Sequence, residues 1–255
     1  MARAILVIAD IGGYTRFMKV HRINLAHAQH IVAVLLEAVI DGAGRAFKLA
    51  KLEGDAAFFY ATEPFDPADK RRALVAIRES FLHRRDELAI NRLCTCDGCV
   101  QAGQLKLKFV AHVGEVAFQK VKRYTELAGV DVILVHRLLK NSVPISEYVL
   151  MSEPLHEALA PALGANATAI SEDLEGLGEA RTFYVDLDAL AGPHTVDVRP
   201  SFFAKFFGWL RMTWRSIPYF LGFKEACEGF GNMELVLPDP KKVRPSAMPP
   251  ANTES

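Results

Sequence analysis

Two aspartates near the start of the chain stand where a buried segment ends and where a hairpin turns. Asp10 follows an apolar run over 4–9, and Asp55 closes the polar triplet 53–55 between two expected strands. If those strands are neighbours in one sheet, both carboxylates reach the same edge. Carboxylate oxygens suit Mg²⁺ or Mn²⁺ bound together with a phosphate group. The alternative is structural, with Asp10 capping a turn and Asp55 shaping the hairpin.

Three of the four cysteines, Cys94, Cys96 and Cys99, form a second cluster. Thiolates at this spacing, with a glycine between them, can wrap Zn²⁺. A tetrahedral site needs a fourth ligand, for which His83, Cys227 or a partner protomer are candidates. A loop of free thiols, a redox-sensing disulfide and an iron–sulfur cluster are the alternatives.

Hydrophobic patterning predicts the elements that must position these residues. The apolar run over 4–9 is rich in β-branched residues and indicates a strand buried on both faces. Further strands are expected over 46–52, 56–60, 104–113, 115–121, 148–150 and 182–185, with a turn at Gly114. Helices are expected over 16–40 and 129–139, and a long helix opens within 64–67 and runs to about residue 91.

The order of these elements predicts one main domain. A β-α-β-β-α-β series followed by a β-α-β tail gives an α+β fold of ferredoxin-like type, an antiparallel sheet covered by helices. We expect this domain over 1–190, an aromatic and basic extension over 191–237, and a disordered tail over 238–255, where Pro, Lys, Ser and Ala are frequent.

Four short segments of this domain carry a set of motifs. They are Ala9 to Thr15, Lys51 to Ala56, Val110 to Val116, and Tyr124 to Arg137. In this order and spacing they resemble the motifs of class III adenylate and guanylate cyclases, with Ala111 in place of a usual glycine. The resemblance covers roughly 4–187 and favours a divergent, uncharacterised bacterial branch of that superfamily, with a cyclase-type extension of the ferredoxin-like core.

The resemblance implies roles for particular residues. Asp10, Asp55 and the backbone carbonyl of Ile11 would bind the divalent metal, Mg²⁺ or Mn²⁺.

Lys51 and Glu126 would read the base, and a lysine beside a carboxylate suits adenine, whose edge offers an acceptor and an amino donor. Arg137 would steady the charge of the transferring phosphoryl group. Cyclases of this family build their site between two protomers, so a homodimer is also implied.

Two positions depart from the family pattern. Ile133 stands where an asparagine orients the ribose, and Leu177 stands where a lysine holds the triphosphate. Cyclisation depends on positioning and charge stabilisation, and losing one such group typically lowers the rate by about 10²–10³. The sequence therefore favours a domain that binds a purine nucleoside triphosphate, with degraded adenylate cyclase activity that converts ATP to cyclic AMP and pyrophosphate. The alternative is a non-enzymatic dimeric signalling or scaffold domain.

The segment from Val198 to Lys224 combines aromatic and basic residues with no acidic residue. This composition is typical of a helix that lies on a membrane surface. The alternative is a helix that packs on the sheet or on a partner protomer.

The net charge of the chain limits the classes of partner that it is expected to bind. The chain has 255 residues, with 30 Lys and Arg against 30 Asp and Glu. A neutral chain has no overall field to attract nucleic acid, so nucleic-acid binding is not expected. No stretch of about 20 apolar residues occurs. We therefore expect a cytoplasmic protein, with peripheral membrane attachment through the C-terminal extension as an option.

Overall fold

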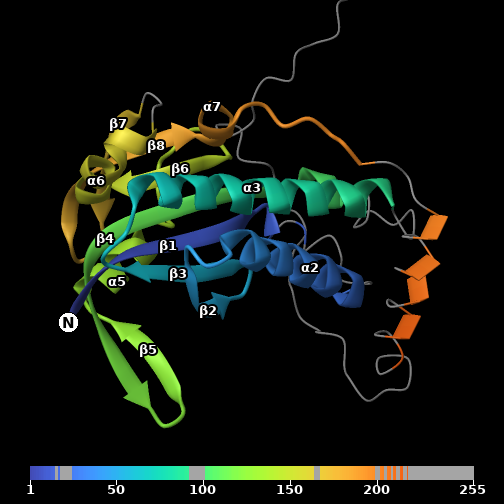
Figure 1. The fold of residues 1–255 in the computed structure, drawn as a ribbon, viewed down its shortest axis with the longest axis horizontal. Coiled ribbons are helices and arrows are strands. Elements are labelled where there is room, and N and C mark those ends of the chain that lie inside the picture. The colour runs from blue at the N-terminus through green and yellow to red at the C-terminus, as the bar shows by residue number, and fades with distance from the viewer. Residues whose placement is uncertain are drawn as a thin grey trace, which may run out of the picture.

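The chain folds around one eight-stranded sheet in the order β2-β3-β1-β4-β6-β8-β7, with β5 paired to β4 (Figure 1). This computed structural model describes residues 1–14, 17, 25–91, 101–163, 167–198 and parts of 202–217. The strands are β1 (Ala2–Gly12), β2 (Lys48–Glu53), β3 (Ala56–Thr62), β4 (Lys106–Val121), β5 (Tyr124–Ala128), β6 (Tyr148–Ser152), β7 (Thr168–Leu174) and β8 (Gly178–Asp186). The helices are α2 (Leu25–Ala43), α3 (Pro67–Ile90), η2 (Ala102–Gln104), α5 (Val130–Arg137), α6 (Glu153–Leu163) and α7 (Leu187–Ala191).

The α+β class is confirmed, and so is the doubly buried first strand. β1 pairs antiparallel with β3 on one side and β4 on the other. Its residues 4–9 are at most 1% exposed. This central position explains why the run is continuously apolar, because both of its faces are covered.

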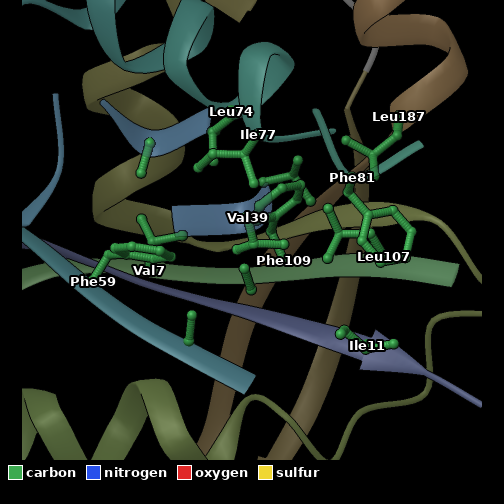
Figure 2. Packing of buried hydrophobic residues seen from close by; sticks show 14 of the residues in the cluster. Val7, Ile11, Val39, Phe59, Leu74, Ile77, Phe81, Leu107, Phe109 and Leu187 are labelled. Atoms are coloured by element: carbon green, nitrogen blue, oxygen red, sulfur yellow. The ribbon is translucent and has the colours of Figure 1, made fainter. Parts of the chain in front are cut away.

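Two cores lie on the two faces of the sheet. On one face α2, α3, α6 and α7 pack against alternate residues of β1 and β4, and Figure 2 shows Val39 and Ile77 pointing toward Val7 and Phe109. On the other face α5 covers Leu6, Ile8 and their neighbours through Val132 and Val135. The end of β1 that carries Asp10 therefore lies between two packed layers.

The long helix α3 begins where the sequence predicts. The side chain of Asp66 accepts a hydrogen bond from the backbone N–H of Ala68 at 3.0 Å, and Pro67 occupies the first turn. Both features favour a helix start, because the capping oxygen satisfies a free N–H and proline has none to satisfy.

The expected turn at Gly114 is wrong. β4 runs without a break from Lys106 to Val121, and the hairpin to β5 turns at Lys122 and Arg123. Gly114 lacks a side chain for a packing reason, since a Cβ there would lie 2.2 Å from Cγ of Asp131.

Several other boundaries differ from the expected ones. The sequence missed β5, β7, α6 and α7. The helix expected over 16–40 is described from Leu25 to Ala43. The cysteine loop 94–99, Cys227 and the tail 238–255 lie outside the described residues. Among the described helices, none has the length and apolar character needed to cross a membrane.

Candidate functional site

Asp10 lies near the end of β1, and the pairing of the sheet decides its neighbours. In the antiparallel registers it stands opposite Ala56 of β3 and Lys108 of β4. The Nζ atom of Lys108 lies 3.0 Å from Oδ2 of Asp10, and both side chains are about one-fifth exposed. Directly opposed residues of an antiparallel pair have close Cβ atoms, so this ion pair follows from the register.

Asp55 is brought to the same edge by the tip of the β2–β3 hairpin. Its backbone carbonyl accepts a hydrogen bond from the N–H of Ile11 at 3.2 Å. Gly54 has φ +67°, a conformation that favours glycine in this tight turn. The hairpin tip is therefore fastened to the end of β1, beside Asp10.

The electrostatics of Asp55 show that the two carboxylates interact. Burial and, second, the negative charge of Asp10 raise the pKa of Asp55 to about 6. Lys108 opposes the shift but does not cancel it. Two carboxylates beside one ammonium leave an excess of negative charge at this edge.

These donors fit a divalent metal held jointly with a phosphate group. Asp10 and Asp55 supply hard oxygen ligands, and the side chain of Ile11 is buried in the core, so only its backbone can contribute. Within the described part of the chain no cluster of three or more His, Cys, Asp or Glu side chains could hold a metal. Two protein carboxylates would thus need further oxygens from the ligand, as Mg²⁺ commonly takes from substrate phosphates.

Lys51, expected to read the base, pairs with a different acid from the one predicted. Its Nζ atom lies 2.8 Å from Oε1 of Glu53 on the same strand. Glu126 lies on β5 and is exposed. The roles of Lys51 and Glu126 toward a base stay predictions.

His136 of α5 contacts Glu53 of β2. Its Nε2 atom lies 3.0 Å from both carboxylate oxygens, and Nδ1 lies 2.7 Å from the carbonyl of Val132. Although burial raises it, the hydrogen bonds from Lys51 and His136 lower the pKa of Glu53. The cluster therefore carries an ionised carboxylate between two potential cations, next to the Asp55 turn. No local motif in the sequence links His136 to Glu53.

Arg137 lies at the end of α5 and is partly exposed. Its Nη1 atom lies 2.6 Å from Oε2 of Glu175, in the turn between β7 and β8. Ile133 and Leu177 are 52% and 38% exposed. Apolar side chains thus face solvent at both positions where the cyclase pattern has polar groups.

A buried polar chain fixes α5 to the sheet, and the sequence did not identify it. Nδ1 of His112 lies 2.7 Å from Oγ of Ser152, and Nε2 lies 3.0 Å from Oδ1 of Asp131. Oδ2 of Asp131 accepts a hydrogen bond from the N–H of Glu115 at 2.6 Å. His112 and Ser152 are only 4% and 5% exposed. Both ring nitrogens of His112 have partners, which fits a structural role.

The predicted zinc ligands Cys94, Cys96 and Cys99 lie outside the described residues, so their role stays a prediction. His83, a candidate fourth ligand, lies on α3 with Nε2 3.5 Å from Oε1 of Glu87.

Comparison with known proteins gives relatives in sequence and in fold. A family model described as "Protein of unknown function (DUF2652)" matches residues 32–148. The protein "Uncharacterized protein Rv2561/Rv2562" of Mycobacterium tuberculosis is 46% identical over 207 residues, which cover 79% of this chain and 94% of that protein.

The similar solved structures are nucleotidyl cyclase domains. The adenylyl cyclase CyaB from P. aeruginosa matches with a TM-score of 0.54 and 14% identity, over 72% of this chain and 94% of that chain. The guanylate cyclase domain of RhGC from Catenaria anguillulae, solved in complex with GTP, matches with a TM-score of 0.52 and 15% identity, over 72% and 96%. At this identity the likeness establishes a cyclase-type fold.

Proposed function

The chain belongs to the family of the Rv2561/Rv2562 protein and has a cyclase-type fold, and on this premise we propose that it binds a purine nucleoside triphosphate together with a divalent metal. The observation that best supports this proposal is that Asp10 and Asp55 lie at one sheet edge, where burial and the charge of Asp10 raise the pKa of Asp55. A divalent ion bridging these carboxylates to phosphate oxygens would neutralise that charge.

Different residues of the protein would bind the metal and the base. Asp10, Asp55 and the carbonyl of Ile11 would hold Mg²⁺ or Mn²⁺, which supplies charge neutralisation at the phosphates. Lys51 lies on β2, beside the Asp55 turn, and would read the base with Glu53 or Glu126. A lysine beside a carboxylate suits adenine, so ATP is the proposed ligand.

Arg137 would stabilise charge on the phosphoryl group in any residual cyclase reaction. Its ion pair with Glu175 must open first, and both side chains are exposed enough for that pair to be weak. Ile133 and Leu177 offer no hydrogen bond to ribose or triphosphate. We therefore propose that nucleotide binding, rather than catalytic turnover, is the main function. The protein would act as a homodimer that signals through its nucleotide-bound state.

Calorimetric titration with ATP and GTP, each with and without Mn²⁺, tests this function. We expect ATP to bind only with Mn²⁺, and Asp10→Ala or Asp55→Ala to abolish the metal-dependent binding. Asp173→Ala, an exposed position on β7, is the matched control and should bind as the parent does. If both site variants bind ATP with Mn²⁺ as well as the parent does, the proposed site is wrong.

A second candidate function is attachment to an anionic membrane surface by the C-terminal extension. The described aromatic residues of this segment are all exposed, from 48% at Phe206 to 78% at Phe202. In Figure 1 its described pieces over 202–217, in orange, lie apart from the sheet and its helices, whereas Gly192 and His194, which precede them, contact α3. Exposed aromatics beside basic residues, with no acid among them, suit insertion at a lipid headgroup layer.

A further inference from the structure

Lys108 is a feature of the carboxylate edge that the motifs do not include. It reaches Asp10 because β1 and β4 pair in a register that sets the two residues opposite each other. The contact of 3.0 Å is largely shielded from water, with the lysine side chain 21% exposed. The chain therefore places a cation of its own where two carboxylates converge.

The surroundings keep this ammonium charged. Burial lowers the pKa of Lys108, but the negative charges of Asp10 and Asp55 and the hydrogen bond to Asp10 raise it. Tyr148 donates its hydroxyl hydrogen bond to Oδ1 of Asn141 at 2.9 Å, so it does not compete as a donor for Asp10. No other cation is recorded in contact with Asp10 among the described side chains.

We propose that Lys108 is a built-in competitor of the divalent metal at the Asp10–Asp55 edge, which makes metal binding depend on the nucleotide. A dication that binds both carboxylates must separate Lys108 from Asp10, and like charges at close range repel. Nucleotide phosphates offer the displaced ammonium a new anionic partner. Metal and nucleotide then strengthen each other's binding by the same factor, as linkage requires.

This inference rests on the proposed function, but its test uses Mn²⁺ alone. Mn²⁺ binding is followed by the electron paramagnetic resonance signal of the free ion, with the full chain and no nucleotide. The parent should bind Mn²⁺ weakly, and Lys108→Met should tighten binding by at least about tenfold. Lys108→Arg keeps the charge and should bind as weakly as the parent, which guards against a packing effect of methionine.

Lys106→Met is the matched control. Lys106 lies two residues away on the same strand and pairs with Glu147 at 2.9 Å. It should leave Mn²⁺ binding unchanged, while adding Asp10→Asn to Lys108→Met should abolish the tightened binding.

The outcomes separate this inference from the proposed function. Equal Mn²⁺ affinity of the parent and Lys108→Met overturns the competition, while Mn²⁺-dependent ATP binding by the parent would keep the proposed function intact. Tightened binding that survives Asp10→Asn also overturns it, since the ion would then lie elsewhere. Absence of Mn²⁺ binding in Lys108→Met overturns it as well, and absence of ATP binding with Mn²⁺ overturns the function itself.

Discussion

At the scale of single residues, the neighbouring carboxylates of Asp10 and Asp55 lower the stability of the fold. Burial and, second, the charge of Asp10 raise the pKa of Asp55, so its ionised form is unfavourable in the folded protein. Natural proteins keep such groups where a ligand needs them, at the expense of the free energy of folding. Lys108 relieves part of the repulsion, which explains how the fold accommodates the pair.

Asp55→Asn should therefore stabilise the protein, and the gain should depend on pH. The folded pKa of about 6 lies above the ordinary value of 3.8, so the penalty is absent below pH 4, grows as pH rises, and is complete above pH 6. Because solvent screens this partly exposed group, we expect a gain of about 1–2 kcal/mol at pH 8. Urea unfolding at pH 8 and pH 4.5 measures it.

Asp173→Asn on β7 is the control for that experiment, since its side chain is exposed. A variant at Asp55 that loses stability at pH 8, or gains equally at both pH values, would contradict the account.

Glu53 makes a second prediction at this scale. It contacts both Lys51 and His136, so Glu53→Gln removes the charge that orients the lysine. We expect this variant to weaken ATP binding more than Glu126→Gln does, because Lys51 contacts Glu53 directly. A larger effect of Glu126→Gln in the same calorimetric titration would restore the pairing expected from the sequence.

At the scale of elements, the position of α5 depends on the chain Ser152–His112–Asp131. This chain joins β6, β4 and α5, and α5 carries Arg137 at its other end. Gly114 leaves the room that Asp131 needs. These hydrogen bonds therefore hold the start of the helix whose last residue is Arg137.

Gly114→Ala should destabilise the fold by about 1–3 kcal/mol, because its Cβ would overlap Asp131. The clash includes the Cβ of Asp131 at 2.6 Å, so Asp131→Gly is the variant that relieves it. In a double-mutant cycle measured by urea unfolding, Gly114→Ala should cost much less in the Asp131→Gly background. Additive effects of the two changes would show that Gly114 acts independently of Asp131.

The sequence predicted some of these elements well and others poorly, for identifiable reasons. The doubly buried β1 and the hairpin tip at Asp55 follow from local patterns and were predicted. The turn at Gly114 was wrong, because a glycine that makes room for a distant side chain looks the same as one that makes a turn. The contacts Asp10–Lys108 and Glu53–His136 depend on strand register and on packing between elements distant in the chain, which no local pattern contains.

At the scale of the whole molecule, the sheet domain and the C-terminal extension differ in how their apolar residues are used. The domain buries most of its large apolar side chains in two cores, whereas Phe202, Phe203 and Trp214 are more than 70% exposed. An exposed aromatic cluster next to basic residues needs a partner surface. We take that partner to be anionic lipid.

The full chain should therefore sediment with anionic vesicles at low salt and less at high salt. Each inserted aromatic side chain contributes about 1.5–3 kcal/mol, and each well-placed basic residue about 1 kcal/mol. The triple change of Phe202, Phe203 and Trp214 to serine should abolish sedimentation, while serine at the exposed Val121 and Val130 should not. Failure of the parent to bind, or binding by the triple variant, would rule out this attachment.

The central claim is that one divalent ion joins Asp10 and Asp55 to a nucleoside triphosphate. Crystals grown with Mn²⁺ and a non-hydrolysable ATP analogue test it directly, because Mn²⁺ is located by its anomalous scattering. We expect a peak within direct coordination distance of both carboxylates and of a phosphate oxygen, with Lys108 moved away from Asp10. Bound nucleotide with no Mn²⁺ at this edge, or with Mn²⁺ elsewhere, would contradict it.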